Sequence, residues 1–184
     1  MTQLKINYAY EVLLSLLKQD RYGRELAKEL KTSLTRVQNI LTELRNINVL
    51  DYKIEGKNHV YFIKKNLLSK SFILNAENYQ LAKILNKHPE LEPIFQDLIK
   101  KSKCSLIILF GSYAKNTEKK DSDIDLYIET TDSKIKEEVQ NIYGLINVKI
   151  GNFNSEDLLI KEIIKNHALI KGGENYYEKI KFFV

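Results

Sequence analysis

A glycine–serine pair in the second half of the chain has the residue types of a phosphate-binding turn. Gly111-Ser112 directly follows the apolar run LIILF and precedes a predicted helix that is under way by Tyr113. A glycine allows the backbone to approach a ligand closely, and a serine hydroxyl beside the free N–H groups of a helix start suits phosphate oxygens. The apolar run itself predicts a strand that is buried on both faces.

Two carboxylates, Asp123 and Asp125, stand two residues apart at the start of a second predicted strand, DIDLYIE. Residues i and i+2 of a strand point to the same face, about 6.6 Å apart. Carboxylates placed in this way can share divalent cations, and Mg²⁺ prefers a few carboxylates completed by substrate phosphate oxygens. A phosphate-binding turn beside such a pair indicates metal-assisted phosphoryl or nucleotidyl transfer.

The stretch GSYAKNTEKKDSDIDL resembles the signature of minimal nucleotidyltransferases of the DNA polymerase β superfamily. That signature has Gly-Ser, often followed by a small residue, Arg and Gly, and then Ser-Asp-x-Asp at a fixed distance. Lys115 and Asn116 stand where Arg and Gly are common. Both departures are mild, because Lys keeps the charge and Asn tolerates a left-handed backbone.

The resemblance covers about residues 90–184 and implies a small mixed sheet flanked by helices. The implied reaction transfers a nucleoside monophosphate from a nucleoside triphosphate, ATP being the leading candidate, to an acceptor hydroxyl with release of pyrophosphate. The nucleotide-binding residues that it implies are Gly111, Ser112 and Lys115. The catalytic residues that it implies, which would also bind Mg²⁺, are Asp123 and Asp125.

The chain departs from the family at a third carboxylate, which active members carry on a later strand. The matching strand here is LINVKIGNF, after a helix predicted over 133–142, and its alternate apolar residues would face the core. Asn147 and Lys149 then lie on the face where the acid is expected. Neither replaces it, because Asn is a neutral ligand and Lys repels a cation.

Three nearby acids are poor substitutes for this third carboxylate. Glu156 and Asp157 follow a good helix start, so they suit the first turn of a helix better than catalysis. Glu129 has the correct parity but lies about 13 Å along its strand from Asp125. Two interpretations stay open: an active enzyme whose third acid comes from elsewhere or from a partner, and a domain that binds nucleotide or metal without efficient transfer.

The excess positive charge of the chain lies entirely in its first third. Residues 1–66 carry 12 Lys and Arg against 7 Asp and Glu, whereas residues 67–184 carry 17 of each. A basic module joined to a neutral one suggests a polyanion-binding domain. A solvated, lysine-rich surface is the alternative.

The pattern of the basic third predicts three helices followed by a β-hairpin. Helical apolar spacing runs over 6–17, a short helix RELAKEL follows Gly23, and Thr32 or Ser33 caps a third helix. The runs VLDYKI and HVYFIK, separated by EGKN, are β-rich and predict the hairpin. Residues 1–66 therefore resemble the winged helix-turn-helix domains of bacterial and archaeal regulators.

The resemblance makes the third helix a recognition helix and the hairpin a wing. Arg, Gln and Asn can make bidentate contacts to base edges in a major groove, and a lysine at the wing tip can contact phosphate. The residues expected to contact nucleic acid are Thr35, Arg36, Gln38, Asn39, Arg45 and Lys57. The alternative is that the domain mediates protein contacts and that these side chains are only solvated.

These patterns together predict an α+β protein with a winged helix over 1–66, a helical connector over 67–89 and a minimal nucleotidyltransferase domain over 90–184. The longest apolar run, Leu106 to Phe110, is too short to span a membrane, which takes about 20 residues. The single cysteine, Cys104, and an N-terminus without the apolar core of a signal peptide favour the cytoplasm.

Three functions remain in competition at this point. The first is Mg²⁺-dependent transfer to a protein or RNA acceptor by an antitoxin-like protein with a DNA-binding head, since related minimal transferases often act on a helical toxin partner. The second is a nucleotide-sensing transcriptional regulator with impaired catalysis, and the third is an RNA-end modifier. DNA, a helical toxin and a second copy of the chain are the expected partners.

Overall fold

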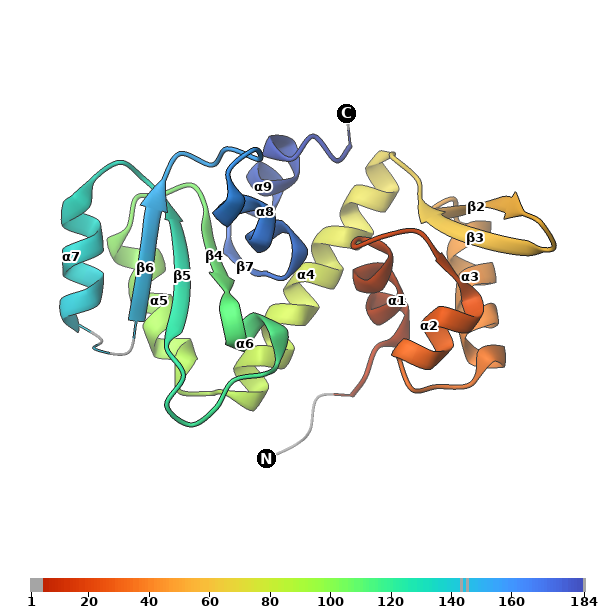
Figure 1. The fold of residues 1–184 in the computed structure, drawn as a ribbon, viewed down its shortest axis with the longest axis horizontal. Helices are drawn as coiled ribbons and strands as arrows, with labels where there is room; N and C mark the ends of the chain where they lie inside the picture. The colour runs from red at the N-terminus through yellow and green to blue at the C-terminus, as the bar shows by residue number, and fades with distance from the viewer. Residues whose placement is uncertain (1–4, 143, 145, 184) are drawn as a thin grey trace. The chain divides into compact units, whose positions relative to one another are not determined.

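The computed structural model describes residues 5–142, 144 and 146–183. The chain divides into two compact units, one that comprises the residues up to Tyr79 together with Phe183 and one that runs from Gln80 to Phe182 (Figure 1). Each unit has its own sheet and its own buried apolar residues. Within the described ranges, no helix combines the length and the apolar character needed to cross a membrane.

The first unit begins with three helices, as the sequence predicts: α1 (Tyr8–Leu16), α2 (Gly23–Glu29) and α3 (Leu34–Asn46). The side chain of Ser33 caps α3 by accepting a hydrogen bond from the backbone N–H of Arg36 at 3.2 Å. Apolar side chains spaced along these helices become fully buried where the helices meet. They include Leu13, Leu26, Val37 and Leu41.

A hairpin completes the first unit. Strands β2 (Leu50–Glu55) and β3 (Asn58–Ile63) pair in antiparallel register, and Gly56 turns the chain between them with a φ of 62°. A third strand that the sequence did not predict, β1 (Arg21–Tyr22), pairs with β3 and gives the order β1-β3-β2. A strand of two residues is too short to show the alternation of apolar and polar side chains from which strands are predicted. Three helices with this small sheet form a winged helix.

Helices follow the hairpin, as expected for residues 67–89. The helix α4 (Leu67–Lys87) continues past Gln80 into the second unit, and α5 (Leu91–Lys101) follows after a short turn at Pro89. In the second unit, Ile84 of α4 and Leu91 of α5 are buried in the core.

The second unit is built on a four-stranded mixed sheet with the order β6-β5-β4-β7 (Figure 1). Strand β5 pairs parallel to β6 and antiparallel to β4, which pairs antiparallel to β7. The strands are β4 (Ile107–Phe110), β5 (Ile124–Glu129), β6 (Ile146–Gly151) and β7 (Ala168–Lys171). The remaining helices are α6 (Gly111–Lys115), α7 (Ser133–Ile142), α8 (Leu158–Lys165) and α9 (Gly173–Lys179).

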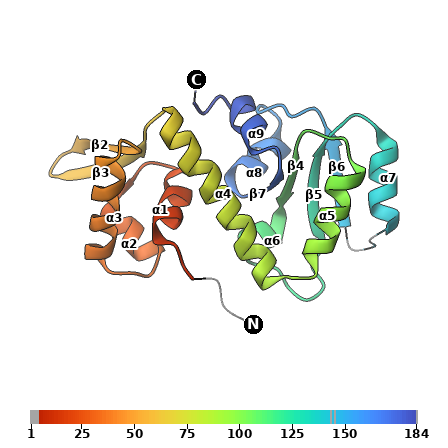
Figure 2. The same ribbon diagram turned by 180° about the vertical axis from the view of Figure 1, so that it is seen from behind.

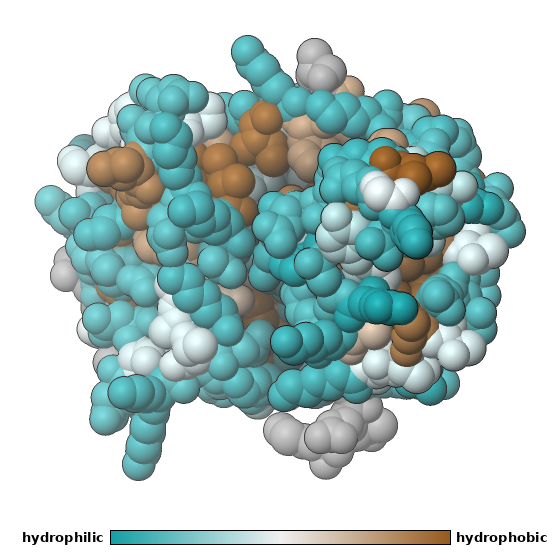
Figure 3. All heavy atoms as spheres, turned by 45° about the vertical axis from the view of Figure 1, so that its right-hand side comes forward, coloured by the Kyte–Doolittle hydropathy of each residue, from teal (hydrophilic) through white to brown (hydrophobic). Residues whose placement is uncertain are grey.

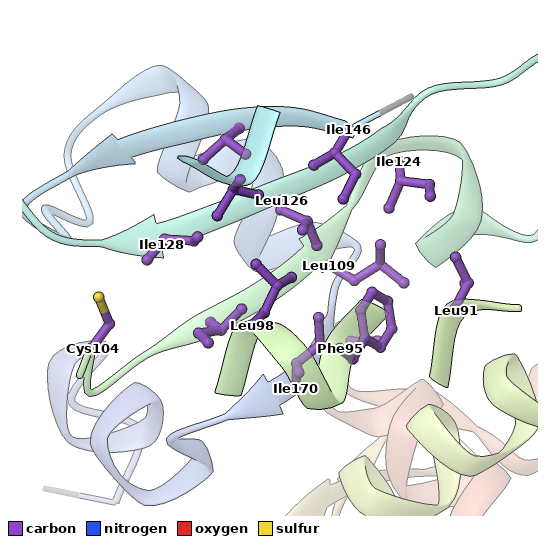
Figure 4. Packing of buried hydrophobic residues seen from close by; sticks show 14 of the residues in the cluster. Leu91, Phe95, Leu98, Cys104, Leu109, Ile124, Leu126, Ile128, Ile146 and Ile170 are labelled. Atoms are coloured by element: carbon purple, nitrogen blue, oxygen red, sulfur yellow. The ribbon is translucent and has the colours of Figure 1, made fainter. Parts of the chain in front are cut away.

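One face of this sheet forms the main core of the unit. Alternate residues of β5 and β6, such as Leu126 and Ile146, pack there with α5 and with Val139 of α7 (Figure 4). Seen from behind, α5 runs across this face of the sheet (Figure 2). Because side chains alternate along a strand, the residues between these apolar ones lie on the opposite face. That face carries Asp125 and Asn147.

The face drawn in Figure 3 is largely hydrophilic, with separate hydrophobic patches. Large exposed apolar side chains include Ile54 on the hairpin and Leu158 at the start of α8, which are 69% and 87% exposed.

Candidate active site

Gly111 joins β4 to α6 in a conformation that few other residues adopt. Its φ is +71°, and a Cβ built on it would lie 2.1 Å from Oδ2 of Asp125. Asp125 is opposite Phe110, the last residue of β4, in the antiparallel register. A side chain at position 111 would therefore collide with the carboxylate and would be strained by its backbone angle. The sequence indicates that the absence of a side chain at position 111 lets a ligand approach the backbone. The structure shows that this absence also leaves room for the carboxylate of Asp125.

Ser112 and the two aspartates lie around this turn. The hydroxyl of Ser112 has no hydrogen-bond partner within the part of the chain that the structure describes, while the Ser112 carbonyl accepts from the N–H of Thr117. Asp123 is exposed just before β5, and Asp125 is half-buried within it. The Gly-Ser turn and the Asp pair are thus brought together at one end of neighbouring strands.

Asn147 is the residue that the structure places beside Asp125. The parallel register pairs the two residues directly, and the Asn147 amide donates a hydrogen bond from Nδ2 to Oδ1 of Asp125 at 2.9 Å. The prediction that Asn147 and Lys149 share the face of the Asp pair is confirmed, because Lys149 lies opposite Tyr127 on the same face. An amide therefore lies beside Asp125, on the face where the family resemblance implies a third acid.

Glu129 is held elsewhere and does not complete the site. Its carboxylate forms a 2.7 Å ion pair with Lys179 and accepts hydrogen bonds from Ser105 Oγ and from the Phe153 N–H. Burial is the largest single effect and opposes the charged form, but the contacts with Lys179, the Phe153 N–H and Ser105 together outweigh it and keep the pKa of Glu129 below its ordinary value. The prediction that Glu156 and Asp157 lie in the first turn of a helix is wrong by a few residues, because α8 begins at Leu158; Asp157 is its N-cap residue and Glu156 precedes it.

Lys115 is positioned by a contact that the sequence could not reveal. Its Nζ donates to Oε1 of Glu162 on α8 at 2.7 Å, and both side chains are partly exposed. Asn116, next to it, adopts the left-handed conformation with a φ of 55°, as the sequence predicted for a residue that replaces glycine. Lys115 would have to exchange Glu162 for a phosphate in order to bind nucleotide.

A buried carboxylate, which the sequence did not single out, fixes the loop between the Gly-Ser turn and the Asp pair. Glu118 Oε1 accepts hydrogen bonds from Lys87 and from His88 Nε2, and its side chain is only 8% exposed. The hydrogen bond from Lys87 holds the pKa of Glu118 below its ordinary value despite burial. The ring of His88 also meets Tyr113 of α6 edge-on at 5.0 Å. These contacts, which we call the Glu118 latch, anchor the loop and α6 together.

The donor types at this site fit a divalent cation in part. Asp123 and Asp125 are hard oxygen donors on one strand face, which Mg²⁺ accepts when water and substrate phosphates complete the shell. In residues 5–142, 144 and 146–183, no group of three or more His, Cys, Asp or Glu side chains is arranged to hold a metal ion. A cation here would thus depend on two carboxylates and on the substrate.

The residues expected to contact nucleic acid are all exposed in the first unit. Those on α3 are Thr35, Arg36, Gln38, Asn39 and Arg45, and Lys57 lies in the turn of the hairpin. Two of them also have contacts within the unit. The guanidinium of Arg36 lies 4.9 Å from the centre of the Tyr8 ring, and that of Arg45 lies 5.2 Å from the centre of the Tyr52 ring. Binding through these two arginines would compete with their cation–π contacts.

Known proteins are similar to part of this chain. A protein of Methanocaldococcus jannaschii that carries the name protein adenylyltransferase is 44% identical over 80 residues, which are 40% of this chain and 60% of that protein. The chain thus spans less than two thirds of this relative. A second protein of the same name and organism is 32% identical over 99 residues, 52% of this chain and 89% of that protein.

A solved toxin–antitoxin complex with AMP-PNP aligns with a TM-score of 0.38 and 20% identity, over 50% of this chain and 86% of that one. Such a distant likeness decides neither fold nor function. Residues 90–175, which contain the Gly-Ser turn, the Asp pair and Asn147, match the family described as "Polymerase beta, Nucleotidyltransferase". With this match and the 32% identity to a relative that the chain covers almost completely, the chain belongs to the polymerase β nucleotidyltransferase family.

Proposed function

We propose that this protein transfers a nucleoside monophosphate from a nucleoside triphosphate to an acceptor hydroxyl at the Gly-Ser turn and the Asp pair. The observation that carries the proposal is the packing of Gly111 against Asp125. It brings a phosphate-binding turn and a carboxylate strand into direct contact, with a Cβ at position 111 excluded by a distance of 2.1 Å. ATP as the donor and a protein as the acceptor are supported by the name protein adenylyltransferase that the relatives carry.

Only a few side chains would take part in the proposed reaction, by orienting phosphates and binding a cation. The acceptor oxygen forms a bond to the α-phosphorus, the bond from that phosphorus to the pyrophosphate oxygen breaks, and the hydroxyl proton passes to solvent. The Ser112 hydroxyl and the N–H groups at the start of α6 would orient the phosphates. A divalent cation bound by Asp123 and Asp125 would neutralise phosphate charge during the transfer.

A second function is favoured by Asn147. Its amide cannot take a proton from an acceptor hydroxyl, and its Nδ2 donates to Oδ1 of Asp125, an oxygen that a cation would otherwise use. A nucleotide-sensing regulator that binds nucleotide and transfers slowly is consistent with this contact. The two functions differ in turnover, since both keep the phosphate-binding turn and Asp123.

The winged helix supplies the remainder of the proposal, a DNA-binding head that would allow the protein to regulate transcription. Its support is the positive charge of residues 1–66 and the exposed polar residues of α3. A helical toxin partner and a homodimer follow from the family resemblance, and an RNA acceptor remains an arm of the test. The cytoplasm is the proposed compartment, consistent with the free and buried thiol of Cys104.

The test is an incubation with each labelled nucleoside triphosphate, Mg²⁺, and protein or RNA acceptors. Wild-type protein is compared with a double variant, Asp123→Ala/Asp125→Ala, and with Asp121→Ala as a matched control from the neighbouring loop. We expect transfer by the wild type and by the control but not by the double variant. Nucleotide binding without transfer to any acceptor would instead support the sensor. Transfer by the double variant would place the active site elsewhere.

The head is tested by substitutions that remove single charges. We expect Arg36→Ala and Lys57→Ala each to weaken binding to duplex DNA. The logarithm of the DNA-binding constant falls linearly with the logarithm of the salt concentration. The slope should become shallower by about one for each phosphate that loses its contact with a cationic side chain. Fluorescence anisotropy over a range of salt concentrations measures both quantities. Unchanged affinity in both variants would remove the DNA-binding head from the proposal.

A further inference from the structure

The first unit contains a hollow of about 420 Å³ between α2, α3 and the hairpin. This volume is within the range of roughly 300–1,000 Å³ that small-molecule sites usually have. Its lining combines aromatic rings with cationic and amide side chains. They include Tyr22, Arg24, Gln38, Lys57, His59 and Tyr61, and we call this feature the wing hollow.

Aromatic rings on one face of the hairpin form a stack at the edge of the wing hollow. The rings of Tyr52 and His59 lie 4.0 Å apart and nearly parallel, at 21°. Tyr61 is directly opposite Tyr52 in the strand register and meets His59 edge-on. His59 is exposed and lines the hollow, so its ring is available to extend the stack with another flat ring. Flat, electron-rich rings stack on aromatic side chains without regard to sequence.

The hydroxyl of Tyr22 donates to Glu55 at 3.0 Å, but three other polar side chains of the wing hollow have no partner among the described residues. In the described part of the chain, the side chains of Arg24 and Lys57 have no ion pair or hydrogen bond, and the amide of Gln38 has no partner. The acidic lining residue, Glu25, accepts a hydrogen bond from the Tyr22 N–H instead. Two unpaired cations beside a stacking ring match the phosphate and the base of a nucleotide unit.

We propose that the wing hollow binds one unpaired base of a single-stranded nucleic acid, with the base stacked on His59 and its phosphates near Arg24 and Lys57. The proposal rests on the nucleic-acid-binding head of the proposed function and adds a single-stranded ligand to the duplex that α3 would bind. A base within a duplex is stacked on both sides by its neighbours, so its ring faces are closed to His59. Single strands therefore gain a contact that duplexes lack.

The test measures the affinity of the full chain for fluorescent 15-nucleotide DNA and RNA single strands, and for the same DNA sequence as a duplex. We expect His59→Ala to weaken single-strand binding about tenfold and to leave duplex binding within twofold, because the variant removes one base–aromatic stack. His59→Phe keeps a ring and should retain most of the affinity. Lys57→Ala should lower the salt slope for single strands by about 0.7.

Lys18→Ala, which removes an exposed lysine outside the wing hollow, is the matched control for loss of charge. Equal effects of His59→Ala on single strands and duplex, or no effect on single strands, would overturn the wing hollow while leaving a duplex-binding head intact. Binding of neither form would overturn the head and the wing hollow together. If the affinity that is lost in His59→Ala is greater for RNA than for DNA single strands, the result supports the site and identifies RNA as its ligand.

Discussion

The two sides of the candidate active site differ in how far they are equipped for transfer. On the β4–β5 side, Gly111 is shaped around Asp125, and Asp123 lies exposed beside it. On the β6 side, the position opposite Asp125 holds Asn147, and the next residue on that face is Lys149. In the proposed function, the first side would bind phosphates and a cation, whereas the second offers no carboxylate that could take a proton. The proposal thus assigns binding and turnover to different strands, which substitutions can test separately.

The largest effect is expected on the β4–β5 side. Asp123→Asn keeps the size of the side chain but removes its charge, so the affinity for an Mn²⁺–nucleotide complex should fall roughly a hundredfold, since a cation contributes several kcal/mol at such sites. Electron paramagnetic resonance of Mn²⁺ in the presence of AMP-PNP measures this affinity. Asp121→Asn is the control and should bind as the wild type does; equal losses in both variants would contradict a site at Asp123.

The turn on the same side should be the next most sensitive feature. Gly111→Ala places a Cβ against Asp125 at a φ of +71°, so we expect about 1–3 kcal/mol less unfolding free energy and at least tenfold weaker nucleotide binding. Urea unfolding and calorimetry measure the two quantities. Gly144→Ala, with nothing within 4 Å of the added Cβ, is the control. An alanine at 111 that is tolerated without loss would mean that the turn relaxes away from Asp125.

A change on the β6 side should act in the opposite direction on metal binding. Asn147→Asp replaces a 2.9 Å hydrogen bond to Asp125 with two facing carboxylates, which should destabilise the metal-free protein by about 1–2 kcal/mol. Binding of Mn²⁺ between the two carboxylates should restore the lost stability. Thermal unfolding with and without Mn²⁺ tests this. Equal melting temperatures of variant and wild type under both conditions would show that the two side chains do not meet as described.

The smallest effect is expected at the Glu118 latch, which lies outside both sides of the site. Glu118→Gln should lower unfolding free energy by about 1–2 kcal/mol at pH 7, because a neutral amide replaces the charged partner of Lys87. The pKa of Glu118 is below its ordinary value of 4.5, so its contribution is present above that pH and is lost as the pH falls through the lowered pKa. The difference between variant and wild type should therefore shrink as the pH falls below 4.5. A difference that is independent of pH would contradict the latch.

Local patterns predicted much of this molecule, and long-range register explains most of what they missed. The helix over 133–142, the cap at Ser33 and the strand parity of Asn147 depend on neighbours in the sequence, and the structure confirms them. The bond between Asn147 and Asp125 spans 22 residues and depends on which residues of β5 and β6 pair. The alternation of side chains along a strand predicts the face on which a residue lies. It does not predict which residue of the neighbouring strand lies opposite.

The Glu118 latch and the Lys115–Glu162 pair were missed for the same reason. Glu118 meets Lys87 across 31 residues, and Lys115 meets Glu162 across 47. Each glutamate stands in a stretch rich in charge, where nothing in the sequence separates a buried carboxylate from a solvated one. The collision that requires glycine at position 111 is likewise visible only once β4 and β5 are paired.

Transfer of label from ATP tests the central claim most directly. ATP labelled at the α-phosphate is compared with ATP labelled at the γ-phosphate, with Mg²⁺ and a protein acceptor, for wild type and Asn147→Asp. We predict α-label and no γ-label on the acceptor, about tenfold faster with Asn147→Asp because the variant adds a group that can take the hydroxyl proton. Adding Asp125→Ala should abolish transfer in both. Transfer of the γ-label, or α-label transfer that survives Asp125→Ala, would contradict the site described here.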